Sequence, residues 1–310
     1  MPSTNGQTAN GQTANGQTAN AKTANGKTTI RFWGVRGSIA SPGPHTAETG
    51  GNTSCVEVRC GDTILILDAG TGIRSLGEMM LARGERDATL LLSHVHWDHI
   101  QGLPFFLPAW IPGKRLEIAG AASALRRALE TQMAPPCFPV RLSDMKAEIP
   151  LREIESGSSF EVGGARILAQ ALEHPGGVLG YRIEHAGRAI VYATDTEHSP
   201  EPGACPDPRL VSLAKGADVL IYDAMYTPDE HAGRSGPARA GWGHSTWQAG
   251  VAVADAAGVD RLVLFHHDPQ RTDEGVRAIE EAARETRPGT VAAREGLEIA
   301  WTADAGRRAA

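Results

Sequence analysis

A dense run of histidines and an aspartate follows an apolar stretch early in the chain, where residues 93–99 read SHVHWDH. His94 and His96 are two residues apart at the end of a predicted strand, so both side chains point to the same side. Asp98 and His99 follow where the chain turns, and their side chains can converge on the same volume. Three imidazoles and a carboxylate this close are costly to bury unless a divalent cation binds their lone pairs. The run therefore predicts a metal site at a strand end.

Three further candidate ligands lie downstream, and each follows within two residues of the end of an apolar run. They are His174, Asp195 and His266. Strands hold functional groups rigidly at their ends, while the adjoining loops leave access for a ligand. After a run such as residues 93–99, a histidine, an aspartate and a histidine in this order predict ligands for a second metal ion.

Short β-branched runs alternate with helical stretches over residues 29–310, and no linker or charge run divides them. This pattern predicts one α/β unit. Hydrophobic residues make up 41% of the chain, enough for a substantial core. Ser245 with Gln248 three residues later predicts a capping box for a helix that ends at Gly258. The expected strands are 30–33, 56–59, 63–68, 89–93, 116–119, 165–172, 181–184, 189–193, 219–223, 261–265 and 297–301, and the other expected helices are 73–83, 123–133 and 274–285.

The start of the chain repeats a five-residue unit, NGQTA, with small variations. The unit has no large apolar side chain and contains the turn dipeptide Asn-Gly, so it cannot bury enough surface to offset its ordering entropy. Residues 1–28 are expected to form a disordered low-complexity tail before a folded hydrolase domain over 29–310. No signal peptide and no apolar run of ~20 residues stands out, so we expect a cytoplasmic protein with no membrane partner.

The HxHxDH run at 94–99, followed by His174, Asp195 and His266, resembles the metallo-β-lactamase superfamily over nearly all of the chain after the tail. The resemblance implies a four-layer αββα sandwich with a dinuclear site along one edge of the two sheets. It also implies that Asp195 bridges the two ions and that Asp68 orients a metal-bound histidine from behind. By the same resemblance, the first ion binds His94, His96 and His174, and the second binds Asp98, His99 and His266.

The resemblance also addresses two questions that spacing leaves open: whether His266 or His267 binds metal, and what His244 does. His266 and His267 are adjacent, and the phosphodiesterase branch of the superfamily aligns His266 with the ligand. Residues 243–248 read GHSTWQ, similar to the GHST motif of the tRNase Z and cyclic-nucleotide phosphodiesterase branch. His244 then precedes a helix N-terminus, where backbone N–H groups favour a phosphate, and it can protonate a departing oxygen. Asp98 is expected to orient the nucleophile as well as to bind metal.

Other branches of the superfamily fit less well, and they matter because the fold alone does not fix function. A flavodiiron oxidoreductase would have Glu in place of His96 and an added flavin domain. A typical two-zinc β-lactamase lacks a bridging Asp at position 195. A thioesterase of glyoxalase II type would carry a helical extension after His266. This thioesterase stays an alternative, as do an RNA 3′-processing phosphodiesterase and a metal-binding sensor without catalysis.

The sequence therefore predicts a dinuclear metal-dependent phosphodiesterase in which a metal-bridging hydroxide attacks phosphorus. Zinc is the favoured ion, with manganese or iron as alternatives, because His and Asp ligands accept all three. The net charge is −6, and the short interval from His174 to Asp195 lacks the arm that tRNA-processing relatives insert. We thus expect a small phosphodiester, with a 3′,5′-cyclic nucleotide favoured, no large nucleic acid as a partner, and a homodimer by resemblance. His198, Asp223 and Tyr226 receive no role.

Overall fold

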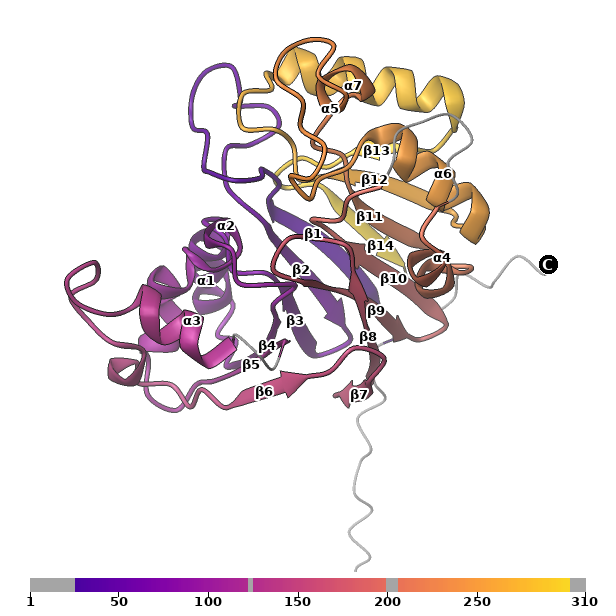
Figure 1. The fold of residues 1–310 in the computed structure, drawn as a ribbon. Coiled ribbons are helices and arrows are strands. Elements are labelled where there is room, and N and C mark those ends of the chain that lie inside the picture. The colour runs from indigo at the N-terminus through magenta and orange to yellow at the C-terminus, as the bar shows by residue number, and fades with distance from the viewer. Residues whose placement is uncertain (1–25, 122–124, 199–205, 302–310) are drawn as a thin grey trace, which may run out of the picture.

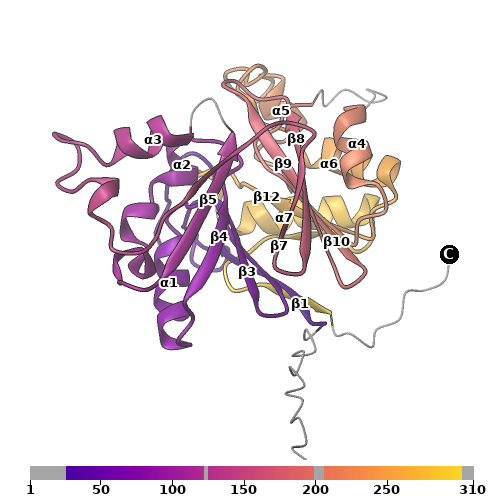
Figure 2. The ribbon, with the colours of Figure 1, turned by 90° about the horizontal axis from the view of Figure 1, so that it is seen from below.

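The computed structural model describes residues 26–121, 125–198 and 206–301. Two seven-stranded sheets pack face to face, and helices cover the outer side of each sheet (Figure 1, and from below in Figure 2). This arrangement confirms the predicted αββα sandwich. The predicted tail over 1–28 lies almost entirely outside the described residues, so its division from a domain over 29–310 stays a prediction. No helix in the described ranges is long and apolar enough to cross a membrane.

The first sheet combines antiparallel strands at one side with four parallel strands at the other. Helices α1 (Ile73–Ala82), α2 (Trp97–Ile100) and α3 (Leu125–Gln132) lie along its outer side. In spatial order its strands are β14 (Glu298–Trp301), β1 (Thr28–Gly34), β2 (Cys55–Cys60), β3 (Thr63–Leu67), β4 (Asp87–Leu91), β5 (Arg115–Ala121) and β6 (Leu151–Ile154).

The second sheet likewise joins an antiparallel part to a parallel one. Helices α4 (Pro208–Ala214), α6 (Trp247–Ala257) and α7 (Asp273–Thr286) cover it, and α5 (Pro228–His231) lies in a long connection. Its strands in spatial order are β13 (Val291–Ala292), β12 (Arg261–Phe265), β11 (Val219–Asp223), β10 (Arg188–Ala193), β9 (Val178–His185), β8 (Ala165–Leu172) and β7 (Ser159–Val162).

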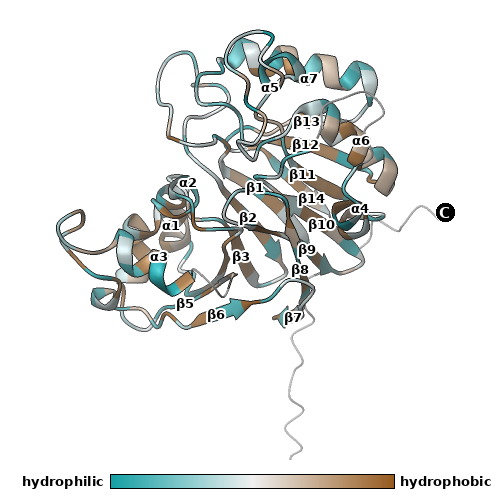
Figure 3. Ribbon diagram, viewed as in Figure 1, coloured by the Kyte–Doolittle hydropathy of each residue, from teal (hydrophilic) through white to brown (hydrophobic). Residues whose placement is uncertain are grey.

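The core between the sheets is built from the inward side chains of both, including Phe32, Leu65, Tyr181 and Phe265, all fully buried. One further apolar layer lies between each sheet and the helices that cover it. Figure 3 shows the apolar residues concentrated along the strands, with hydrophilic residues on the outer sides of the helices. Each large apolar side chain contributes roughly 1.5–3 kcal/mol when buried. The strands therefore form a rigid platform for the groups at their ends.

The expected strands all occur with ends shifted by at most three residues, but short edge strands were not predicted. These are β6, β7 and β13, which lie at sheet margins and are only two to four residues long. The predicted capping box at Ser245 is wrong. The N-cap of α6 is Thr246, whose hydroxyl accepts from the backbone N–H of Ala249 at 3.3 Å, because Ser245 is fully buried and bonds Tyr222 instead.

Six strands end at the same edge of the sandwich. Strands β3 and β4 run parallel in the first sheet, and β10, β11 and β12 run parallel in the second. Strand β8 has the same direction as β10, because both are antiparallel to β9. The residues that follow these strands, from Asp68 to His266, lie far apart in the sequence but meet at this edge, and they include every candidate metal ligand.

Candidate metal centre

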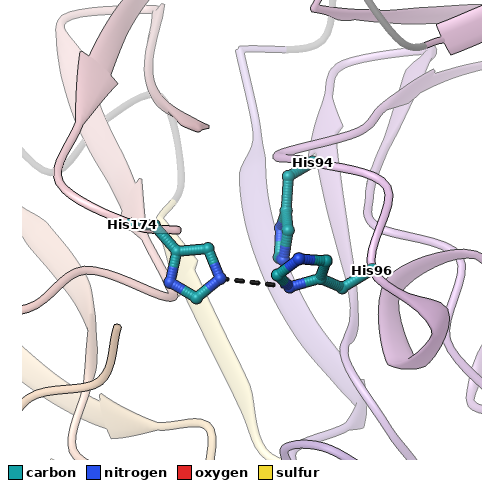
Figure 4. Close-up of side chains that lie close together, drawn as sticks. All are labelled: His94, His96 and His174. Carbon is teal, nitrogen blue, oxygen red and sulfur yellow. Dashed lines mark hydrogen bonds between the residues drawn. The ribbon is translucent and has the colours of Figure 1, made fainter. Parts of the chain in front are cut away.

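Three histidines from the two sheets form the first ligand group (Figure 4). His94 and His96 follow β4, and His174 follows β8. The Nε2 atom of His174 lies 3.1 Å from Nδ1 of His96. One ring nitrogen of each histidine lies within 4.8 Å of those of the others, so the three face a common point.

A second group joins two carboxylates and two imidazoles, all buried: Asp98, His99, Asp195 and His266. Nε2 of His99 lies 3.0 Å from Oδ1 of Asp195, and Nε2 of His266 lies 3.0 Å from Oδ2 of the same carboxylate. Both imidazole nitrogens also lie 3.2 Å from Oδ2 of Asp98. Four potential ligand atoms therefore surround one small volume.

The Asp195 carboxylate lies between the two groups. Its Oδ1 atom is 3.9 Å from Nε2 of His94 in the first group, in addition to its contacts in the second. The side chain is almost completely buried. This is the position that a bridging ligand would need, and bridging is the role that the resemblance implied for Asp195.

The residues present fit a pair of divalent ions. Nε2 of His94 is buried and has no hydrogen-bond partner among the described residues. Nε2 of His99 and Nε2 of His266 face each other at 3.2 Å, although Nδ1 of His99 is already bonded elsewhere. Two nitrogens bound to one tetrahedral zinc ion at about 2.0–2.1 Å would lie roughly 3.4 Å apart. A cation that shares these lone pairs explains both the orphaned nitrogen and the close approach.

The charges of the two groups differ. Burial and the neighbouring histidines lower the pKa of His94 well below its usual value, so its imidazole is neutral. Burial alone would lower the pKa of His99 too, but the carboxylates of Asp195, Asp98 and Asp68 raise it well above the usual value. Although burial opposes it, the charges of His266 and His99 hold the pKa of Asp195 well below its ordinary range. In the second group the positive charge of the histidines is balanced by the aspartates. In the first group burial lowers the pKa of all three histidines, so their neutral imidazoles can offer lone pairs to a cation.

Residues behind the ligands fix their orientation. Oδ2 of Asp68 lies 2.7 Å from Nδ1 of His99, and the same carboxylate accepts bonds from Ser93 and from the Tyr192 hydroxyl. Nδ1 of His174 donates to the Gly243 carbonyl at 2.8 Å. Each bond leaves the opposite ring nitrogen, Nε2, to face the centre. Asp68 therefore lies where the sequence analysis expected an orienting residue.

Strained backbone is concentrated at the centre. Only five non-glycine residues in the described ranges have positive φ, and three of them are Asp68 (61°), Asp195 (50°) and His266 (59°). A fourth, Ser38 (61°), donates its backbone N–H to Oδ2 of Asp98 at 2.7 Å. Such conformations cost about 1–3 kcal/mol each and persist where surrounding structure imposes them. The sandwich imposes them here to aim carboxylates and imidazoles at one volume.

His244 faces the second group, and its partner is a residue to which the sequence analysis gave no role. Nδ1 of His244 lies 2.9 Å from Oδ2 of Asp223, which ends strand β11. Burial would lower the pKa of His244, but the charge and hydrogen bond of Asp223 raise it to about 9. The imidazole rings of His244 and His266 stack with centroids 5.0 Å apart. The position of Asp223 after an apolar strand was the only signal in the sequence.

The other histidines lie apart from the ligand groups. Nε2 of His267 lies 3.0 Å from the Ala293 carbonyl, and burial lowers the pKa of His267 to about 3. His267 thus faces away from the centre, in keeping with the choice of His266. His198, which the sequence left without a role, lies 2.6 Å through Nδ1 from the Tyr222 hydroxyl. Tyr226 packs edge-on against His244, with ring centroids 5.9 Å apart.

Comparison with known proteins places this chain in a family. The model of the beta-lactamase superfamily domain matches residues 63–267. Ribonuclease Z of Methanopyrus kandleri is 29% identical over 76% of this chain and 87% of its own length. Ribonuclease BN of Escherichia coli is 27% identical over 65% and 77%, respectively. The crystal structure of a diphosphatase from the PhnP family shares the fold, with a TM-score of 0.64, 20% identity, and coverage of 89% of this chain and 97% of that one.

These relatives overturn one prediction. The expectation that no large nucleic acid is a partner is wrong, because proteins that match about two thirds or more of this chain are named ribonucleases. The prediction relied on the net charge of −6 and on the short interval between His174 and Asp195. Net charge is a weak guide here, since phosphate binding depends on the local potential near the site.

The family match spans strands β3 to β12 and includes all seven candidate ligands. The two groups of histidine and aspartate ligands at the edge of its sandwich form a site suited to two divalent ions. The chain belongs to the β-lactamase superfamily and is a metal-dependent hydrolase.

Proposed function

We propose that the protein hydrolyses phosphodiester bonds at a dinuclear metal centre. The observation that carries the proposal is the pair of ligand groups joined by Asp195, with the His244–Asp223 pair beside them. His94, His96 and His174 would hold one ion, and Asp98, His99 and His266 the other, with Asp195 between the two. Two divalent ions, zinc being the first candidate, would supply an activated water and neutralise charge on the phosphate oxygens.

His244 serves as the general acid in this proposal. Asp223 holds its Nδ1 atom, so Nε2 is the nitrogen free to donate a proton. With a pKa of about 9, the imidazole is protonated at neutral pH. One nitrogen of His244 lies within 4.8 Å of ligand atoms of Asp195 and His266. A phosphodiester bound at the ions would therefore have its leaving oxygen beside a proton donor.

The surroundings of the site favour a substrate that carries a nucleobase. Trp97, between His96 and Asp98, is 72% exposed, and Trp242, two residues before His244, is 57% exposed. Exposed tryptophans next to site residues in the chain offer surfaces on which bases could stack, with about 1–3 kcal/mol per base. A 3′,5′-cyclic nucleotide is one candidate. RNA with an extended 3′ end is the second, favoured by the relatives named ribonuclease Z.

A substrate panel after metal reconstitution tests the proposal. It contains 3′,5′-cyclic nucleotides, a 3′-extended RNA, bis(p-nitrophenyl) phosphate, a glutathione thioester and a cephalosporin. We expect turnover of at least one phosphodiester and none of the thioester or the cephalosporin. Turnover of the thioester with every phosphodiester inert would contradict the proposal. The ratio of the cyclic-nucleotide rate to the RNA rate decides between the two substrate candidates.

The general-acid role has its own test. His244→Ala should keep its metal content and lose about 10²–10⁴-fold in rate on a phosphodiester with a poor leaving group. The loss on p-nitrophenolate esters should be much smaller, because that leaving group needs no proton. Asp223→Asn should show the same pattern at reduced size. Equal losses on both leaving groups would remove the role.

A further inference from the structure

Glu197 lies two residues after Asp195, and its carboxylate reaches across to a different segment. Its Oε1 atom accepts from the backbone N–H of Gly241 at 2.7 Å, and Oε2 accepts from that of Gly243 at 2.8 Å. Oε1 also lies 3.0 Å from Nε2 of His231, in helix α5. The side chain is only 20% exposed. One carboxylate therefore joins the end of β10 to α5 and to the loop before α6.

The loop that Glu197 holds carries groups of the metal centre. The Gly243 carbonyl accepts from Nδ1 of His174, and His244 is the next residue. Gly243 has φ of +86°, and a Cβ atom there would lie 2.2 Å from Nδ1 of His174. The backbone thus lies directly against the imidazole, and a shift of the loop moves both histidines.

The loop has few hydrogen bonds of its own, among them that of the Trp242 N–H to the Arg239 carbonyl at 3.1 Å. Gly241, like Gly243, has positive φ (+84°), and glycine gains more conformational freedom than other residues when a constraint is removed. Hydrogen bonds from backbone N–H groups to a carboxylate are about twice as strong as neutral ones. Two of them on alternate residues fix the backbone on both sides of Trp242. Within the described residues, no other side chain accepts from these two N–H groups.

We propose that Glu197 is a positioning residue that sets loop 241–244 against the metal centre. Through Gly243 it fixes the orientation of His174, and through the following residue it places His244 beside the second ligand group. A single carboxylate thereby aligns a ligand of one ion with the proton donor at the other. The part that concerns His244 rests on the proposed hydrolysis of phosphodiesters, whereas the part that concerns His174 requires only metal binding.

The test compares Glu197→Ala, Glu197→Gln and the matched control Glu173→Ala. Glu173 stands beside His174, but its side chain is 72% exposed and pairs only with Arg209, at 3.5 Å, among the contacts of the described chain. Hydrogen–deuterium exchange of residues 241–243, zinc titration and steady-state kinetics are measured on each full-length protein. Exchange and zinc titration need no substrate.

For Glu197→Ala we expect exchange of the loop amides at least about tenfold faster and zinc affinity about 10–100-fold weaker for one of two ions. Its kcat should fall more on a poor leaving group than on p-nitrophenolate, with little change in KM. Glu197→Gln should lie between Ala and the wild type, because its amide oxygen can still accept one of the two bonds. Glu173→Ala should match the wild type in every readout.

Unchanged exchange at residues 241–243 in Glu197→Ala would overturn the proposal. So would faster exchange with unaltered zinc affinity and unaltered dependence on the leaving group, since the loop would then be structural only. Equal behaviour of the Gln and Ala variants, or a loss in the Glu173 control, would also count against it. If the wild type hydrolyses no phosphodiester, the proposed function fails, while exchange and zinc titration still decide the role of Glu197 toward His174.

Discussion

The two halves of the metal centre are built by different means. The half formed by His94, His96 and His174 offers neutral imidazoles, and His96 is exposed to solvent. The half formed by Asp98, His99, Asp195 and His266 is fully buried and carries two carboxylates. Bonds from Asp68 and Ser38 hold this buried half from behind. The first half, called the exposed half after His96, is held by the Gly243 carbonyl, which accepts from His174, and by the Ser93 hydroxyl, 3.1 Å from Nδ1 of His94.

This difference has a physical consequence. Since Asp195 is shared, the buried half differs by the Asp98 carboxylate, which adds charge attraction to the binding of a cation, and by burial, which excludes competing water. The preset orientation of His99 reduces the entropy lost on binding. We therefore expect the buried half to bind its ion more tightly and the exposed half to be the one that exchanges.

The largest effect is expected where the two halves meet. Asp195→Ala removes the group shared by both, so both ions should be lost at micromolar metal. The phosphodiesterase rate should fall by about a thousandfold or more, equivalent to roughly 4 kcal/mol. Elemental analysis and the steady-state rate measure the two losses. Asp218→Ala, just before β11 at the opposite end of the strand, serves as the control, and a variant at 195 that retained two ions would refute the shared role.

A matched pair of variants compares the halves directly. His99→Ala leaves the buried Asp68 carboxylate without its imidazole partner, which should cost roughly 3–5 kcal/mol in free energy of unfolding. His96→Ala, at an exposed position, should cost less than about 1 kcal/mol. Excess zinc should restore part of the activity of His96→Ala only. Denaturant unfolding and rates at increasing zinc concentration measure this contrast, and similar values for both variants would break the comparison.

Asp68→Asn tests the support of the buried half alone. The amide keeps the size of the carboxylate but loses the charge that orients His99 and raises its pKa. The affinity for the ion of the buried half should fall about 10–100-fold, with the other half unaffected. Competition with a chromogenic chelator measures both constants. An equal loss of affinity for both ions would show that Asp68 supports both halves of the metal centre.

Stepwise removal of the ions by a chelator tests the comparison of the two halves without any substitution. The ion of the exposed half should leave first, and its loss should lower the free energy of unfolding by about 1.4 kcal/mol when free metal is tenfold above the dissociation constant. A second, larger decrease should follow when the buried half is emptied. Thermal unfolding along the chelator titration separates the two steps, whereas a single step would indicate equal affinities.

Much of the fold was predictable because each long strand carries its own signal. Strands β8, β11 and β12 were predicted to the residue. Strands β11 and β12 are nearly continuous apolar runs, as a strand buried on both faces requires, and β8 alternates buried apolar residues with more exposed ones. The edge strands β6, β7 and β13 were not, because they are short and held mainly by their neighbours. The cap of α6 was misplaced by one residue because burial of Ser245 is a tertiary property.

The sequence by itself determined the kinds of candidate ligand and their order along the chain, since HxHxDH at a strand end and three later residues at strand ends leave few other uses for such side chains. The orienting role of Asp68 was expected, but only the tertiary structure decided that Asp223 holds His244 and that Glu197 holds the loop before α6. The pairing of His244 with Asp223, and the reach of Glu197 to Gly241 and Gly243, join residues 21 to 46 positions apart. Such contacts form because the two sheets bring their strand ends to one edge. The sequence around each residue does not show which distant residue will lie next to it.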